Sequence, residues 1–121
     1  MIKLVNRNEV GFSHVVNEAL KHNLFVPDFT FYEMLTEYTD NIIKLCILYD
    51  EEPIGLGMVW RYPQDVYVVE DCDHIGCFVK PEYRRKGHGS KIVAALGGTK
   101  GLMWRPGETQ DSGLFWLEMD K

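Results

Sequence analysis

The residues best suited to chemistry form one short loop, Arg84-Arg85-Lys86-Gly87-His88-Gly89-Ser90, which follows an apolar stretch and precedes an apolar-periodic one. A Gly-x-Gly turn at the start of a helix leaves backbone N–H groups unpaired at the positive end of the helix dipole, where they attract anions. Glycine also allows the positive φ angles and the close approach that wrapping a phosphate requires. The loop therefore predicts a phosphate or pyrophosphate site.

The spacing excludes two other phosphate loops. A Walker A loop requires Gly-x-x-x-x-Gly-Lys-Ser/Thr, whereas here Ser90 precedes Lys91. A dinucleotide fingerprint requires a third glycine at the position of Ile92. The pattern that remains is Arg-x-x-Gly-x-Gly.

Residues 73–96 resemble the acetyl-CoA-binding core of the GNAT superfamily of N-acetyltransferases. In that family the fourth strand ends in a Val-x-Pro-x-Tyr-Arg stretch, which leads to an Arg/Gln-x-x-Gly-x-Gly/Ala loop and then a helix. The positions that match are Val79, Pro81, Tyr83, Arg84, Gly87 and Gly89. A whole string at one spacing is more specific than a lone Gly-x-Gly. The resemblance indicates a small bacterial or phage-type member with a shortened C-terminus.

Around this loop, the hydrophobic periodicity predicts the elements that must position it. Asn6 with Glu9, and Thr30 with Glu33, resemble helix capping pairs. The predicted order is a strand at 2–5, a helix at 7–22, a short second helix from Thr30 through Tyr38, a hairpin of strands at 42–49 and 54–62, a brief strand-like run at 66–69, a strand at 74–79 with a bulge at Gly76, a helix at 89–96 ended by Gly97 and Gly98, and a strand at 101–104. Residues 112–119 fit either a helix or a strand.

This order predicts one domain, 1–121, of the α/β (α+β) class with a GNAT-like acyl-CoA N-acyltransferase fold. We expect a central, mostly antiparallel mixed sheet flanked by helices. The C-terminal strands should be shortened or missing, because fourteen residues follow Gly107 whereas a typical member continues for about 20 to 30 more. A partner subunit could supply the missing sheet edge, since exposed strand edges are a liability.

Composition limits the remaining classes of function. The net charge is −5, which argues against general nucleic-acid binding. No apolar run predicts a membrane span or a secretory signal, so a cytoplasmic protein is expected. Three cysteines at irregular spacing argue against a disulfide framework and favour reduced thiols.

The resemblance implies that acetyl-CoA is the co-substrate. Backbone groups of Cys77, Phe78 and Val79 would face the pantetheine and the acetyl carbonyl, and an N–H group at a bulge there would stabilise the oxyanion. The residues that would hold the pyrophosphate are Arg84, Arg85, Lys86, Gly87, His88, Gly89 and Ser90.

An amine acceptor must lose a proton before it attacks. The resemblance places the general base of some family members at Asp73, with Glu70, Asp71 and His74 as competitors; a solvated acidic loop is the alternative. Many members use a late tyrosine as the general acid, but no tyrosine follows Tyr83. The late aromatic residues Phe115 and Trp116 cannot protonate sulfur usefully, which leaves water as the proton donor.

Two other uses of these residues carry less weight. Cys72, His74 and Cys77 suggest a zinc site, but Cys77 would point to the other strand face and no further ligand pair follows at finger spacing, so no metal is expected. Cys77 could also carry an acyl group, although a buried strand cysteine is more often a small hydrophobe.

Two classes of function remain. The first is an acetyl-CoA-dependent N-acetyltransferase that transfers an acetyl group to an amine of a small molecule or a protein by direct attack on the thioester. The second is a catalytically reduced GNAT-like domain that serves as a structural or interaction module in a larger, phage or virion-associated assembly. A homo-oligomer, or a subunit of a larger assembly, is expected in either case.

Overall fold

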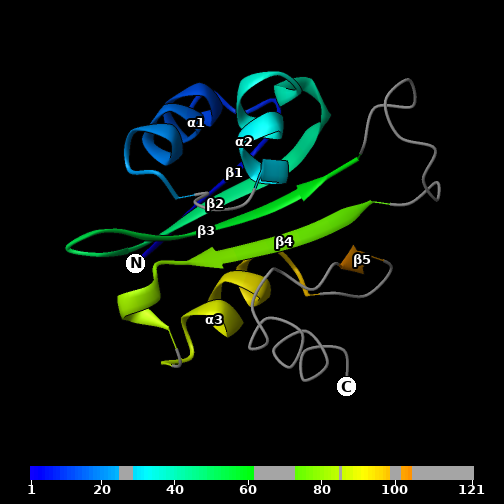
Figure 1. Cartoon of the computed structure of the whole chain (residues 1–121). Coiled ribbons are helices and arrows are strands. Elements are labelled where there is room, and N and C mark those ends of the chain that lie inside the picture. Colours follow the sequence, from blue (N-terminus) through cyan, green and yellow to red (C-terminus); the bar gives the residue numbers. More distant parts are fainter. Residues whose placement is uncertain (25–28, 62–72, 85, 99–101, 105–121) are drawn as a thin grey trace.

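The computed structural model describes residues 1–24, 29–61, 73–84, 86–98 and 102–104. Figure 1 shows a central sheet between two layers of helices. The elements are β1 (Ile2–Asn6), α1 (Phe12–Lys21), α2 (Phe29–Thr36), the 3-10 turn η1 (Thr39–Asn41), β2 (Ile42–Asp50), β3 (Glu52–Trp60), β4 (His74–Val79), the 3-10 turn η2 (Pro81–Tyr83), α3 (His88–Ala95) and β5 (Met103–Trp104).

The described strands form one sheet in the order β1-β2-β3-β4-β5. The first four strands pair antiparallel, whereas β5 pairs parallel to the start of β4, with His74 opposite Met103 and Ile75 opposite Trp104. The predicted fold class, a mostly antiparallel mixed sheet flanked by helices, is confirmed. Residues 66–69 and 112–119, and with them the expected shortening of the C-terminal strands, lie outside the described residues.

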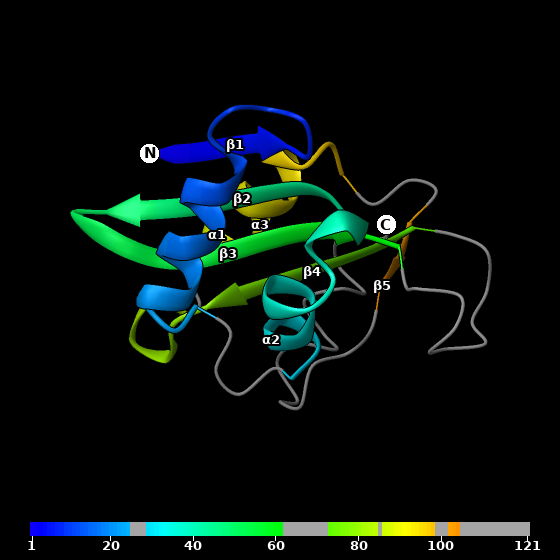
Figure 2. The ribbon, with the colours of Figure 1, turned by 90° about the horizontal axis from the view of Figure 1, so that it is seen from above.

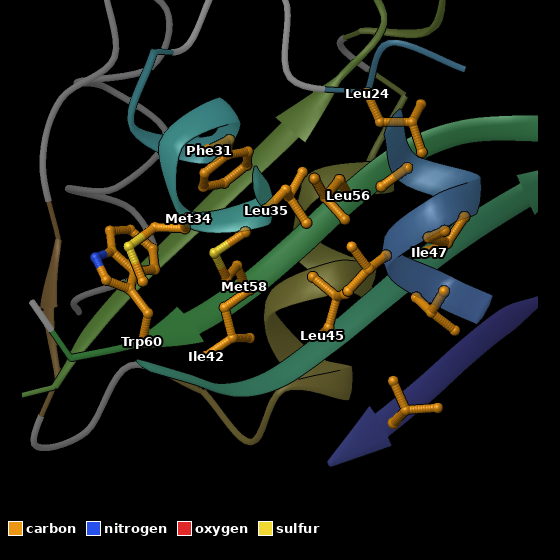
Figure 3. Packing of buried hydrophobic residues seen from close by; sticks show 14 of the residues in the cluster. Leu24, Phe31, Met34, Leu35, Ile42, Leu45, Ile47, Leu56, Met58 and Trp60 are labelled. Atoms are coloured by element: carbon orange, nitrogen blue, oxygen red, sulfur yellow. The ribbon is translucent and has the colours of Figure 1, made fainter. Parts of the chain in front are cut away.

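Two helices cover one face of the sheet and α3 covers the other, as the side view in Figure 1 and the view from above in Figure 2 both show. The helix α1 buries one stripe, formed by Phe12, Val15, Val16 and Ala19, at the spacing of an amphipathic helix. Figure 3 shows how α2 contributes Phe31, Met34 and Leu35 to the same core. These side chains meet the residues of β3 that face them, Leu56, Met58 and Trp60.

On the opposite face, α3 lies close to the sheet because β3 has glycines beneath it. A Cβ atom added at Gly55 would lie 2.8 Å from Ile92 Cδ1, and one at Gly57 would lie 2.9 Å from Leu96 Cδ1. Those distances are too short for real carbon contacts, so side chains at both positions would push the helix away. The glycines therefore set how closely α3 and its preceding loop approach β4.

The helix α1 begins at Phe12, five residues later than the sequence predicts. Asn6 and Glu9 do pair, with Asn6 Nδ2 donating to Glu9 Oε1 at 2.7 Å, but they close a turn before the helix. In that turn the Glu9 N–H donates to the Asn6 carbonyl at 3.0 Å. The N-cap is Gly11, which makes no side-chain cap. Similarly, α2 begins at Phe29, so Thr30 lies inside that helix and is not its N-cap.

The predicted bulge at Gly76 is wrong. The pairing of β3 with β4 runs without a shift from Gly55 opposite Val79 to Trp60 opposite His74, and the shifts in register lie between β2 and β3 instead. Gly76 is explained by packing, since an added Cβ atom would lie 2.6 Å from the Phe31 ring. The glycine makes room for α2 on the sheet.

The predicted end of α3 is confirmed. Gly97 and Gly98 both have positive φ angles, 101° and 85°. The Gly98 N–H donates to the Val93 carbonyl at 3.0 Å, and the Gly97 N–H donates to the Ala94 carbonyl at 3.1 Å. This pair of bonds is a Schellman motif, which satisfies the last carbonyls of the helix. None of the helices in the described part of the chain has the length and apolar character needed to cross a membrane.

Candidate active site

The outer edge of β4 is the first component of the site. The Lys80 N–H donates to the Ile54 carbonyl at 2.9 Å, which continues the ladder between β3 and β4. Hydrogen-bonded pairs alternate along an antiparallel ladder, so Phe78 bonds toward Leu56 while Cys77 and Val79 direct their N–H and C=O groups to the other side. The described part of β5 pairs only with His74 and Ile75. Cys77 and Val79 thus present backbone groups to an edge that β5 leaves open here.

This alternation changes the expectation for one of the three strand residues. Phe78 was expected to offer backbone groups to the pantetheine together with Cys77 and Val79. Its N–H and C=O groups belong to the β3 ladder, and its side chain packs in the core with α1 and α2. Only Cys77 and Val79 are placed to pair with an extended ligand along β4.

The turn η2 brings Arg84 back beside the end of β4. Pro81 begins the turn, and the Tyr83 N–H donates to the Lys80 carbonyl at 2.9 Å. Arg84 Nε then donates to the Val79 carbonyl at 2.8 Å, and its guanidinium carbon lies 5.8 Å from the centre of the Phe78 ring. The first arginine of the loop is therefore held against the strand.

The N-terminus of α3 supplies the predicted anion site. Gly87 is the N-cap with a φ of 79°, a left-handed conformation that favours glycine, and no side chain caps the helix. The Lys91 N–H donates to the Gly87 carbonyl at 3.3 Å, so the N–H groups of the three residues between them have no acceptor within the helix. Those residues are His88, Gly89 and Ser90. They present donors where the helix dipole is positive.

The side chains near these amides add cationic character. Lys86 and Lys91 are exposed, while His88 is half-buried. His88 Nδ1 is shielded from solvent and has no hydrogen-bond partner among the described residues. Arg85 lies outside the described residues, so its place in the site stays a prediction.

Cys77 lies between the open edge and α3. Its thiol is in contact with the Gly89 carbonyl, with Sγ 4.0 Å from the oxygen. Burial, and secondarily the neighbouring Cys46, raises the pKa of Cys77 to about 12. The thiol is therefore protonated at neutral pH, and because the thiolate is the nucleophile, an acyl-carrying role for Cys77 is disfavoured.

Among the candidate bases, the structure describes Asp73 and His74. Asp73 is half-buried and its Oδ1 accepts from Arg61 Nε at 2.9 Å. His74 is 1% exposed and stacks on the Trp60 indole, with ring centres 5.8 Å apart. A side chain so deeply enclosed is poorly placed to meet a substrate. Glu70 and Asp71 lie outside the described residues, as does Cys72 of the zinc alternative. The described residues contain no group of three or more ligands that could hold a metal.

A separate groove of about 580 Å³ lies between the N-terminal half of α1 and η1. Phe12 and Val16 line it together with polar side chains, and Arg7 Nη1 crosses to the Asp40 carbonyl at 2.7 Å. Sequence reasoning did not find these residues, because no local pattern marks a groove assembled from two distant segments. None of the predicted site residues lines it.

In the part of the chain that the structure describes, the open edge of β4 leads into the uncapped N-terminus of α3, which is the arrangement that the resemblance implies for an acyl-CoA site. The model of the acetyltransferase (GNAT) family matches residues 14–96. This match covers more than half of the chain, which therefore belongs to the GNAT acetyltransferase family. Family membership makes acetyl-CoA the co-substrate, as the sequence predicts.

Solved structures agree with this fold. The chain is similar to the ribosomal-protein-alanine N-acetyltransferase from Brucella melitensis biovar Abortus 2308, with 12% identity, 98% of this chain and 89% of that chain covered, and a TM-score of 0.56. It is similar to AAC(6')-Iy in complex with the bisubstrate analogue CoA-S-monomethyl-acetylneamine, with 19% identity, 98% and 89% covered, and a TM-score of 0.53. It is also similar to a histone acetyltransferase HPA2 and related acetyltransferase from Corynebacterium glutamicum, with 13% identity, 97% and 83% covered, and a TM-score of 0.53. The comparison with curated proteins gave no match.

Proposed function

We propose that the chain is an N-acetyltransferase that moves the acetyl group of acetyl-CoA to an amine by direct attack on the thioester. One observation carries this proposal. The open edge of β4 at Cys77 and Val79 continues, through η2, to the uncapped N-terminus of α3. An extended pantetheine and a pyrophosphate require these two features side by side, since one pairs with amides along a strand and the other binds at a helix end.

In this proposal the cofactor lies along β4 like an added strand. The pantetheine amides pair with backbone groups of Cys77 and Val79. The pyrophosphate accepts from the N–H groups of His88, Gly89 and Ser90, while Arg85 and Lys86 add positive charge. The side chain of Phe78 acts from the core by holding the strand in place.

Acetyl transfer follows from this placement. The amine nitrogen attacks the thioester carbon, and the carbonyl oxygen becomes an oxyanion that accepts from an outward N–H group of β4. The carbon–sulfur bond then breaks, and the leaving thiolate takes a proton from water. The outward N–H groups exist without a bulge, since alternation alone turns Cys77 and Val79 toward the edge.

Asp73 is proposed as the general base that receives the proton of the amine. Cys77 lies four positions further along the extended strand, which corresponds to about 13 Å. Direct proton transfer requires hydrogen-bond distance, or one intervening water. The proton therefore passes from the amine to Asp73 through ordered water. The carboxylate oxygen of Asp73 that does not accept from Arg61 would accept a hydrogen bond from that water.

The acceptor is proposed to be an amine of a small molecule or a protein, which the net charge of −5 would attract as a cation. A cytoplasmic location, a bacterial or phage source and a homo-oligomer are parts of the same proposal. The alternative of a structural module, virion-associated or otherwise, has no support from the comparisons. The loop motif also favours the enzyme, because a purely structural domain has no physical need for the predicted anion site.

Calorimetric titration with acetyl-CoA tests the proposal. The wild-type chain should bind, and Gly89→Glu should abolish binding because it places a carboxylate among the phosphate donors. Ala94→Glu is the matched control, since it adds the same charge at an exposed position of α3 beyond the loop. A wild-type chain that gives no heat at millimolar acetyl-CoA would overturn the proposal. Release of free CoA thiol with a panel of amines then identifies the acceptor class.

A further inference from the structure

We infer that Arg84 is a positioning residue that fixes the end of β4 through the Val79 carbonyl, and that it is not primarily a phosphate ligand. The ligand-binding part of this inference rests on the proposed function. Arg84 is half-buried and makes two contacts with the strand that precedes it. Lys86, two residues further on, is exposed in the same loop. The two cations therefore have different surroundings.

The hydrogen bond to Val79 is the first part of the argument. The Val79 carbonyl points to the open side of β4 and has no β5 partner among the described residues. Arg84 Nε donates to it at 2.8 Å, which satisfies an acceptor that would otherwise remain free at the cofactor edge. A bond from a charged donor is also stronger than one between neutral groups.

The contact with Phe78 is the second part. The guanidinium carbon lies 5.8 Å from the centre of the Phe78 ring, within the range of a cation–π contact. Phe78 is 8% exposed and belongs to the core with α1 and α2. Arg84 thus links the loop to two successive strand residues, one facing the core and one facing the cofactor edge. It holds the loop and the strand as one unit.

This bond also limits how a pantetheine pairs with β4. With its carbonyl occupied, Val79 offers only its N–H group, whereas Cys77 offers both N–H and C=O. The acyl-pantetheine is thereby directed to one register along the strand. A register shift of one residue would place the thioester carbonyl at groups that face β3.

Three substitutions separate positioning from phosphate binding. Arg84→Met removes the donor and the charge, Arg84→Gln keeps a donor without charge, and Lys86→Met removes a charge from the same loop without touching Val79. Each variant is titrated with acetyl-CoA and with S-acetylpantetheine, which has no pyrophosphate. A positioning role predicts that Arg84→Met weakens both ligands by a similar factor, roughly tenfold, and that Arg84→Gln restores most of the affinity for S-acetylpantetheine. Lys86→Met should weaken acetyl-CoA alone.

The opposite pattern would overturn the inference. If Arg84→Met weakens acetyl-CoA but leaves S-acetylpantetheine unchanged, Arg84 acts on the phosphates by its charge. If Arg84→Gln is as weak as Arg84→Met toward both ligands, a hydrogen-bond donor at this position does not restore binding, and the bond to the Val79 carbonyl is not the basis of the effect. Hydrogen exchange without any ligand separates this result from a failure of the proposed function. The Lys80 amide, which bonds to Ile54, should exchange faster in Arg84→Met and return toward the wild-type rate in Arg84→Gln. Unchanged exchange in Arg84→Met would reject the positioning role even in a chain that binds no acetyl-CoA.

Discussion

Asp73 sits where β4 begins, and its carboxylate already has a cationic partner. Arg61, at the end of β3, donates to Oδ1 at 2.9 Å, and its side chain is 54% exposed. An ion pair so open to solvent contributes little to stability. The ion pair instead orients the Asp73 carboxylate, because Arg61 holds one oxygen and leaves the other oxygen for water or substrate. The proposed role of Asp73 as a base therefore does not compete with a role in the stability of the fold.

Asp73→Asn should lower kcat about 100-fold at neutral pH, because the amide cannot accept the proton of the amine. The affinity for acetyl-CoA should stay unchanged, since the proposed pyrophosphate site lies at the other end of β4. Steady-state kinetics with the best amine and calorimetry with acetyl-CoA measure the two effects separately.

The control is Asp40→Asn, which removes an exposed carboxylate from η1 and leaves the carbonyl that Arg7 contacts. Equal kcat values for Asp73→Asn and the wild-type chain would remove Asp73 from the role of base and favour Glu70 or Asp71.

The Cys77 thiol predicts a dependence of stability on pH. Its pKa rises from 9.0 to about 12 in the folded chain because burial disfavours the thiolate. The folded state thus keeps a proton that the unfolded state releases, so this contribution to stability is present below about pH 9 and is lost as the pH rises toward 12. Urea unfolding at neutral pH and near pH 10 should show a smaller loss of stability for Cys77→Ala than for the wild-type chain.

Cys77→Ala also changes packing, which shifts the free energy of unfolding at every pH by the same amount. The slope with pH is therefore the quantity to compare. Equal slopes for the variant and the wild-type chain would mean that the pKa of Cys77 does not differ between the folded and the unfolded state.

At the scale of elements, the glycines of β3 determine how α3 meets the sheet. Gly57→Ala should destabilise the chain by about 1 to 3 kcal/mol, because its Cβ atom would lie 2.9 Å from Cys46 Sγ and from Leu96 Cδ1. Gly11→Ala is the matched control. Its φ is −82° and an added Cβ atom would make only an ordinary contact, 3.7 Å from Val5 Cγ1. Chemical denaturation of both variants measures the difference.

The Gly11→Ala variant should stay within about 0.5 kcal/mol of the wild-type chain. Since the proposed anion site lies at the N-terminus of α3, Gly57→Ala should also weaken acetyl-CoA binding. A Gly57→Ala chain as stable as Gly11→Ala would show that α3 is free to move away from the sheet.

Much of the element order could be predicted from the sequence, because local signals mark most boundaries. The strand 74–79 is confirmed without change, and the turn cluster after Tyr49 correctly separates β2 from β3. The failures have tertiary causes. The pairing of Asn6 with Glu9 forms a turn instead of a helix cap. Gly76 is required because the Phe31 ring of α2, which is distant in the sequence, packs against it.

The candidate site shows the same division. The left-handed Gly87 and the uncapped start of α3 follow from the loop motif itself, which is local. Which strand amides face the cofactor edge depends on register with β3, and the contact of Arg84 with Val79 depends on how η2 turns back. Neither the outward strand amides nor the Arg84 contact can be predicted from residue types, because both depend on which residues lie close together in the folded chain.

At the scale of the whole molecule, β1 is an edge of the described sheet. Met1 and Tyr49 exchange backbone hydrogen bonds where β1 pairs with β2. Because such pairs alternate along the ladder, Ile2, Leu4 and Asn6 direct their backbone groups away from β2. Leu4 is 40% exposed there, beside the exposed Lys3. A charged residue on an edge strand opposes pairing with another chain. We therefore expect Lys3 to oppose association through this edge.

Lys3→Val should increase self-association, because it removes that charge and raises strand propensity. Sedimentation velocity over a range of concentrations should show a larger and more concentration-dependent coefficient than for the wild-type chain. Lys21→Val, an equal loss of charge at an exposed position on α1, is the control. Identical sedimentation of both variants would show that the β1 edge does not govern association, and the wild-type measurement itself tests the predicted homo-oligomer.

The row formed by Cys46, Gly57 and Cys77 has a consequence for the redox behaviour of the chain. Gly57 pairs with Cys46 on one side and Cys77 on the other, so the two cysteines are separated by two strand spacings, about 9.5 Å between Cα atoms. A disulfide requires Cα atoms closer than about 7 Å. Air oxidation cannot join these two thiols without separating the strands, and both are protonated in the folded state, with pKa values of about 12. As long as the sheet is intact, these two thiols do not form a disulfide with each other.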